Sequence, residues 1–162
     1  MSNPGFELLS PVPATWFDDL RQILREYADS LPVDLSFQSF DLELDDLPGE
    51  YASPRGALFL GLLGGDVAGC CAVRPLDNVD YSNACEMKRL YVRPAFRGKG
   101  LGRRLAESAM EAGRIAGYDH ILLDTLNEME SARALYEDLG FFEIPPFYLS
   151  PISGAHYLLA RL

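Results

Sequence analysis

The sequence predicts a single α/β domain in which helices cover both faces of a mixed β-sheet. The chain has 162 residues, of which 48% are hydrophobic and 23% charged, as in a globular domain with a full core. Apolar strand-like runs alternate with amphipathic helical patterns along its length. No internal repeat, low-complexity segment or linker interrupts this order, so we expect residues 1–162 to form one domain.

The predicted order is strand, helices, hairpin, strand, helix, strand, helix and two final strands. Strands are expected at residues 6–9, 57–63, 66–73, 84–92, 121–124, 141–143 and 155–162. Helices are expected at residues 14–30, within 31–46, at 100–116 and between 127 and 140.

Apolar spacing and chain breakers predict the elements of the first half. Apolar residues recur three and four positions apart over residues 14–30, which predicts a helix that ends at Pro32. Gly64 and Gly65 stand between two apolar runs, as in a β-hairpin turn. Pro75 is expected to end the second strand of that hairpin.

Glycines and caps delimit the elements of the second half. A stripe of small and apolar residues over residues 100–116 suits a helix that lies flat on a sheet, and Gly117 is placed for its C-cap. Asn127 and Glu130 have the spacing of a capping box for the next helix, and Gly140 follows that helix.

The charge and cysteine content exclude several classes of protein. A net charge of −10 disfavours general nucleic-acid binding, which needs clustered cations. An acidic surface can attract cationic substrates such as amines, or can serve only solubility. The three cysteines, Cys70, Cys71 and Cys85, are an odd number without metal-ligand spacing, which argues against a disulfide framework and a zinc site. Cys70 and Cys71 lie in an apolar strand-like run, which predicts buried thiols. Neither a signal sequence nor a membrane-length apolar run is found, so we expect a cytoplasmic protein without a membrane partner.

A glycine-rich turn interrupts the acidic background. Half of the 14 lysines and arginines gather around it: Lys88, Arg89, Arg93, Arg97, Lys99, Arg103 and Arg104. Gly98, Gly100 and Gly102 leave the backbone N–H groups accessible where a strand ends and a helix begins, which predicts a pyrophosphate-binding loop. The spacing fits neither a Walker A loop nor a dinucleotide-binding fingerprint. An ordinary strand-to-helix turn is the alternative.

Two motifs resemble those of the GNAT N-acetyltransferase superfamily. The pattern Arg97-x-x-Gly100-x-Gly102 resembles the acetyl-CoA-binding motif of that family, and residues 132–141 resemble its second motif, A-x-x-L-Y-x-x-x-G-F. The resemblance implies the GNAT fold, with a mostly antiparallel sheet of about six or seven strands. It also implies acetyl-CoA as cosubstrate, an amine as acceptor, no metal, and a homodimer as a common assembly.

The resemblance also assigns the coenzyme site. The loop backbone would bind the pyrophosphate, the preceding strand would pair with the pantetheine arm, and one of its N–H groups would meet the thioester oxygen. The residues implied are Leu90, Tyr91, Val92, Arg97, Gly98, Lys99, Gly100, Leu101, Gly102, Asn127 and Ser131. Many relatives carry asparagine where this chain has Met129. Asn127 can instead serve only as a helix cap, and Ser131 can be an exposed residue of the first turn.

Two residues are the expected catalytic groups. The resemblance places the hydroxyl of Tyr136 near the coenzyme sulfur, where it can protonate the departing thiolate. Glu86 lies on the strand that enters the turn and can accept the proton of the amine, directly or through water. A salt bridge between Glu86 and Lys88 or Arg89 is the structural alternative. His120 and His156 are further titratable candidates, and structural roles are expected for both.

These observations predict an acetyl-CoA-dependent N-acetyltransferase that acts on a primary amine of a small molecule or peptide by direct attack in a ternary complex. The alternative is a catalytically silent acyl-CoA-binding module, acting as a sensor or a partner-binding protein. The acceptor would be bound by residues of the first helices and the last strands: Tyr27, Asp29, Phe37, Phe40, Tyr51, Phe147, Tyr148 and Tyr157.

Overall fold

A computed structural model describes residues 5–31, 39–126, 130–148 and 154–162. Within them, the strands are β1 (Phe6–Leu9), β2 (Ala57–Leu63), β3 (Asp66–Leu76), β4 (Ala84–Val92), β5 (His120–Leu126), β6 (Phe142–Ile144) and β7 (Ala155–Arg161). The helices are α1 (Phe17–Ser30), α2 (Phe40–Asp45), α3 (Leu101–Ile115) and α4 (Glu130–Asp138). Short 3-10 turns occur at Ala14–Trp16, Gly49–Tyr51 and Pro94–Phe96. The predicted fold class is confirmed.

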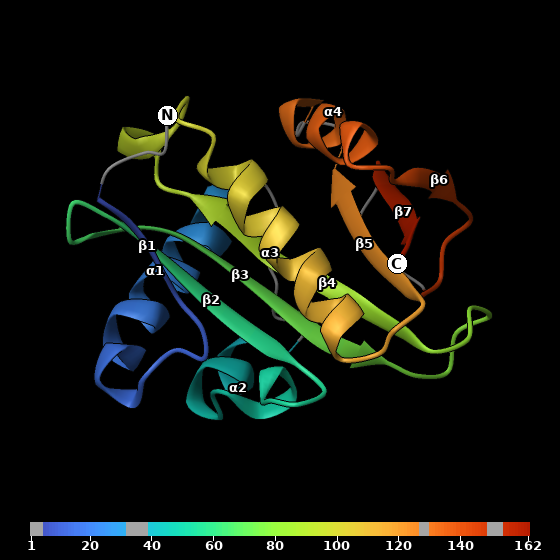
Figure 1. The fold of residues 1–162 in the computed structure, drawn as a ribbon, viewed down its shortest axis with the longest axis horizontal. Helices are drawn as coiled ribbons and strands as arrows, with labels where there is room; N and C mark the ends of the chain where they lie inside the picture. Colours follow the sequence, from blue (N-terminus) through green and yellow to red (C-terminus); the bar gives the residue numbers. More distant parts are fainter. Residues whose placement is uncertain (1–4, 32–38, 127–129, 149–153) are drawn as a thin grey trace.

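The seven strands of the described chain form one mixed sheet in the order β1-β2-β3-β4-β5-β7-β6. All neighbours are antiparallel except β4 and β5, which run parallel. The helix α3 supplies the crossover that a parallel pair requires. Figure 1 shows α3 crossing the front of the sheet, with α1 behind it.

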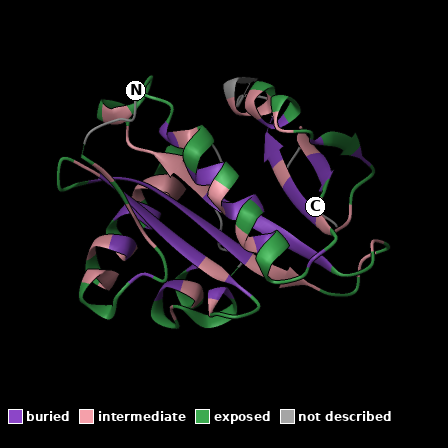
Figure 2. Cartoon of the chain, in the orientation of Figure 1, coloured by how far each residue is buried: buried purple, intermediate pink, exposed green. Residues whose placement is uncertain are grey.

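Two apolar layers hold the helices to the sheet. On one face, Leu105 and Ala109 of α3 pack against strand residues such as Phe59 and Ile121. On the other face, Leu20 and the neighbouring apolar residues of α1 and α2 pack against the alternate residues of β2 and β3. The central strands are therefore buried on both sides, as the purple colour shows (Figure 2). The three cysteines lie in these layers as buried free thiols.

One predicted boundary was wrong. Pro75 does not end its strand, because β3 continues to Leu76. Pairing between β2 and β3 begins at Ala57 and Val73, so β3 has no β2 partner beyond that point. Pro75 therefore lies where β3 pairs with β4 alone. Proline has no N–H to donate, and it is tolerated there because the strand has a neighbour on one side only. In the described part of the chain, no helix has the length and hydropathy needed to cross a bilayer.

Candidate active site

The glycine-rich turn opens α3, as the sequence predicts. Gly98 and Gly100 have φ values of +81° and +78°, which L side chains rarely adopt. A Cβ built on either residue would meet no atom within 4 Å, so open space lies over the loop. Gly100 is the N-cap of α3 and makes no side-chain capping hydrogen bond. The first N–H groups of α3 have no partner within the helix and lie at the positive end of its dipole, an arrangement that fits a pyrophosphate group.

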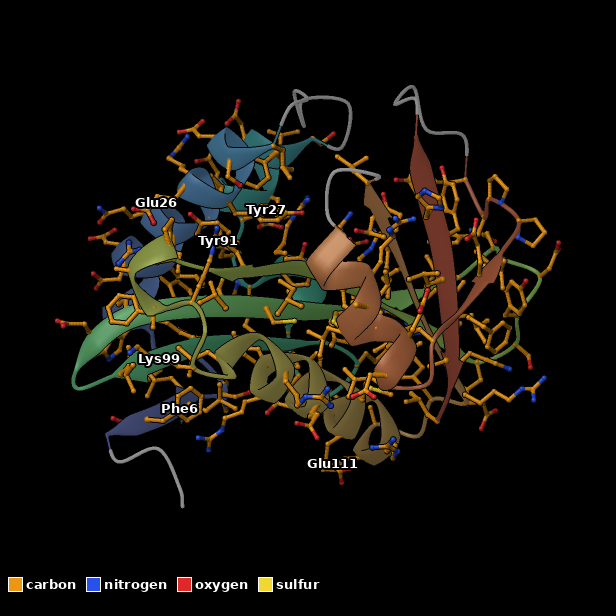
Figure 3. The ribbon with its side chains drawn as sticks, turned by 90° about the horizontal axis from the view of Figure 1, so that it is seen from above. Phe6, Glu26, Tyr27, Tyr91, Lys99 and Glu111 are labelled. Carbon is orange, nitrogen blue, oxygen red and sulfur yellow. The ribbon has the colours of Figure 1, made fainter. Side chains whose placement is uncertain are left out.

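The positive charge at this loop is smaller than the sequence suggests. Arg89, Arg93 and Arg103 are ion-paired with carboxylates. Within the described residues, Arg97, Lys99 and Arg104 form no such pair, and Arg97 donates from Nε to the carbonyl of Val92 over 2.9 Å. Figure 3 shows Lys99 on the loop that leads toward α3. The loop can still neutralise an anion through Arg97, Lys99 and Arg104, while Lys88 lines a separate cavity.

The strand before the loop separates from its parallel neighbour. β4 pairs with β5 only from Ala84 with His120 to Glu86 with Leu122, although both strands continue for several residues. A bulge follows at Arg89, after Met87 and Lys88, since the register shifts opposite Cys71 and Arg89 has φ +62°. The segment containing Leu90, Tyr91 and Val92 therefore has a backbone edge toward β5 that can pair with an extended ligand.

Arg89 at the bulge is buried and anchors α2. Its side chain is 2% exposed and donates two hydrogen bonds to the carboxylate of Glu43, over 3.0 and 2.9 Å. The guanidinium carbon also lies 5.1 Å from the ring centre of Phe40 and 5.9 Å from that of Tyr27. A six-residue helix such as α2 is too short to be stable alone, so this buried contact fixes its position.

Tyr136 lies on the inner side of α4. It is buried, and its ring packs edge-to-face against Phe141 with 5.7 Å between ring centres. Burial is the main cause that raises the pKa of Tyr136 well above 10, so its hydroxyl stays protonated at neutral pH. Asn127 lies outside the described residues. Ser131 belongs to α4, but its side chain also lies outside the described part.

Glu86 is the last residue of β4 that pairs with β5, and it is 1% exposed. Its Oε1 accepts hydrogen bonds from the guanidinium of Arg74, with Nε and Nη2 each 2.7 Å away. Arg74 reaches Glu50 through Nη1 over 2.8 Å. Glu86 therefore forms a salt bridge, as the structural alternative expects, but with Arg74 of the adjacent strand β3. Arg89, one of the expected partners, binds Glu43 instead.

A cavity of about 800 Å³ borders Glu86. It is lined by α2, the turn that follows it, β3, β4 and one residue near the C-terminus: Ser39, Leu42, Glu43, Asp45, Asp46, Pro48, Gly49, Glu50, Tyr51, Arg74, Glu86, Lys88 and Tyr148. Of the predicted acceptor residues, Tyr51 and Tyr148 reach it.

The other predicted acceptor residues lie elsewhere in the fold. Tyr27 packs against Tyr91 of β4, as Figure 3 shows. Phe147 and Tyr157 pack against each other and against Tyr148. Asp29 is exposed on α1, and Phe37 lies outside the described residues.

The two histidines make structural contacts. Nδ1 of His120 lies 2.7 Å from the carbonyl oxygen of Ser82. His156 lies between Arg133 and Glu143, with its Nδ1 3.2 Å from Oε2 of Glu143. Neither histidine lines the cavity.

Sequence reasoning missed two residues of the site. The sequence assigns no role to Arg74, although its guanidinium holds Glu86. Asp124 lies on β5 beyond the last residue paired with β4, and it accepts a 2.6 Å hydrogen bond from the hydroxyl of Tyr148. The available signal for Asp124 is that it is the single carboxylate within the mostly buried strand β5.

Comparison with known proteins identifies close relatives. Residues 17–141 match the acetyltransferase (GNAT) family. The chain is 36% identical over 142 residues to an uncharacterized N-acetyltransferase of Schizosaccharomyces pombe, covering 87% of this chain and 85% of that protein. It is 32% identical over 118 residues to N-acetylaspartate synthetase of Danio rerio, but covers only 41% of that longer protein and 71% of this chain.

Solved structures share the fold. An acetyltransferase from Streptococcus agalactiae superposes with a TM-score of 0.78 at 21% identity, over 98% of this chain and 99% of that one. The yncA protein of Salmonella typhimurium, a putative acetyltransferase solved with its cofactor acetyl-CoA, superposes with a TM-score of 0.69 at 17% identity, over 97% and 94% of the two chains.

The buried pair of Arg89 and Glu43 yields a stability prediction. Glu43→Ala leaves the buried guanidinium without its carboxylate, so we expect a loss of about 3–5 kcal/mol in the free energy of unfolding. Glu26→Ala removes the carboxylate that pairs with Arg93, where the two side chains are 40% and 23% exposed. We expect that variant to lose about 1 kcal/mol or less. Urea denaturation measures both, and equal losses would contradict the anchoring role of Arg89.

Proposed function

Because the chain belongs to the GNAT acetyltransferase family and so uses acetyl-CoA, we propose that it acetylates a primary amine of a small molecule or peptide by direct attack in a ternary complex. The observation that carries this proposal is the glycine loop, where two residues with positive φ leave open space before an uncapped helix N-terminus. Bound acetyl-CoA supplies the activated thioester carbonyl that the amine attacks.

The coenzyme would occupy the loop and the edge of β4 beyond the bulge. The N–H groups of Gly98, Lys99, Gly100, Leu101 and Gly102 would bind the pyrophosphate, where the helix dipole favours negative charge. The charges of Arg97 and Lys99 would reinforce this contact. The backbone of residues 90–92 would bind the pantetheine arm as an added strand does. Asn127 and Ser131 remain predicted contacts.

Three groups would carry the chemistry. A backbone N–H among residues 90–92 would stabilise the negative charge that develops on the carbonyl oxygen. The hydroxyl of Tyr136 would donate its proton to the departing sulfur, and its raised pKa keeps that proton in place before transfer. The carboxylate of Glu86 would accept a proton from the amine, directly or through a water molecule. Its pairing with Arg74 holds the carboxylate at the point where β4 separates from β5.

The loop assignment predicts a selective loss of coenzyme affinity. Gly100→Ala introduces a Cβ into the open space over the loop, so we expect acetyl-CoA to bind about tenfold more weakly. Gly64→Ala is the matched control, because Gly64 also has positive φ and open surroundings but lies in the β2–β3 turn. Both variants should lose about 1 kcal/mol of stability from backbone strain. Calorimetric titration measures the affinities, and equal affinity in the two variants would refute the loop assignment.

The proposed acid role predicts a defect in turnover rather than binding. Tyr136→Phe keeps the ring packing and removes the proton donor, so we expect turnover to fall about a hundredfold with little change in acetyl-CoA affinity. Tyr118→Phe is the control, since that buried tyrosine donates instead to the carbonyl of Arg55. A thiol-release assay with a panel of amines measures both variants. Unchanged turnover in Tyr136→Phe would remove the acid role.

A further inference from the structure

The cavity beside Glu86 is positioned to hold the acceptor. Its volume of about 800 Å³ is ample for a small molecule. Glu86 and Lys88 of β4 form part of its lining, and Glu86 is the residue at which β4 leaves β5. An acceptor in this cavity would therefore lie beside the segment of β4 that carries the proposed coenzyme contacts.

The guanidinium of Arg74 in the cavity is poorly available to a ligand carboxylate. The guanidinium of Arg74 lies between Glu86 and Glu50, with its Nε, Nη1 and Nη2 all directed at carboxylate oxygens. An anionic ligand would have to displace one of these built-in partners. Lys88 is the other cation, and burial lowers its pKa because desolvation disfavours the ammonium form.

Carboxylates outnumber cations around the cavity. Five carboxylates line it, namely Glu43, Asp45, Asp46, Glu50 and Glu86, against Arg74 and Lys88. Glu43 is neutralised by Arg89, and Glu50 and Glu86 share Arg74. Asp45 and Asp46, at the end of α2, are exposed and form no ion pair with any residue that the structure describes. The rim of the cavity therefore keeps two uncompensated negative charges.

We propose that this cavity is the acceptor site and that it selects a primary amine bearing a second positive charge over an amine bearing a carboxylate. The inference rests on the proposed acetyl transfer and specifies its acceptor class. One ammonium would lose its proton and react near Glu86, while the second would lie at the rim with Asp45 and Asp46. An amino acid would instead bring its carboxylate toward charges of the same sign.

A series of matched four-carbon amines tests the selection. The compounds 1,4-diaminobutane, n-butylamine and 4-aminobutanoate share one primary amine and differ only in the group at the far end. L-Aspartate is included because one relative is named an N-acetylaspartate synthetase. We expect kcat/KM for thiol release to be about tenfold higher for the diamine than for butylamine, and lowest for the two carboxylates. A carboxylate-bearing amine as the best substrate would overturn the proposal.

Paired variants test the residues. The double variant Asp45→Asn with Asp46→Asn should bring the ratio of kcat/KM for diamine and butylamine close to one. Glu107→Gln removes an exposed carboxylate on α3, on the other face of the sheet, and should leave that ratio unchanged. If the double variant still prefers the diamine to butylamine as the unmodified protein does, Asp45 and Asp46 do not bind the second ammonium and the assignment is overturned.

Binding measurements separate this inference from the proposed function. If acetyl-CoA does not bind in calorimetry, the proposed function fails. If it binds but no amine releases thiol, titration of the protein with 1,4-diaminobutane in the presence of CoA decides. Saturable binding of the diamine that is lost in the double variant supports the cavity as the acceptor site. If the diamine does not bind although acetyl-CoA does, the cavity assignment is overturned and the coenzyme site is not.

Discussion

The bulge in β4 at Arg89 is the constraint on which the site depends. On one side, pairing with β5 ends at Glu86, before the bulge, so residues 90–92 have a backbone edge that β5 does not pair. On the other side, the bulge carries the buried guanidinium that holds Glu43, and with it α2. One local departure from regular pairing therefore shapes both the proposed coenzyme site and a wall of the cavity.

The charges of the site are arranged in internal pairs rather than as a basic patch. Arg89 pairs with Glu43, and a single guanidinium, that of Arg74, is shared by Glu86 and Glu50. What remains is positive at the glycine loop and negative at the end of α2. These two surpluses match the two proposed ligands, an anionic coenzyme and a cationic amine. The positive one follows β4 along the chain, and the negative one lies on the cavity that Glu86 and Lys88 of β4 line.

Local signals predicted most of the fold and the loop, because apolar periodicity and glycine spacing are properties of short segments. The sequence does not reveal the bulge, which interrupts the alternation of side chains in residues 84–92 by shifting the register at Arg89. The partner of Glu86 was beyond sequence reasoning, because Arg74 meets it only through the antiparallel register of β3 and β4. Likewise, the hydrogen bond of Asp124 could not be predicted, because its donor Tyr148 lies 24 positions later in the chain.

The proposed coenzyme site is tested most directly by an NMR titration of the isotope-labelled protein with acetyl-CoA, in which the backbone amide resonances are monitored. We expect the largest shifts on two segments, residues 90–92 and residues 98–102, because those N–H groups would contact the pantetheine arm and the pyrophosphate. Shifts confined to other segments, or none at saturating coenzyme, would contradict the proposed site.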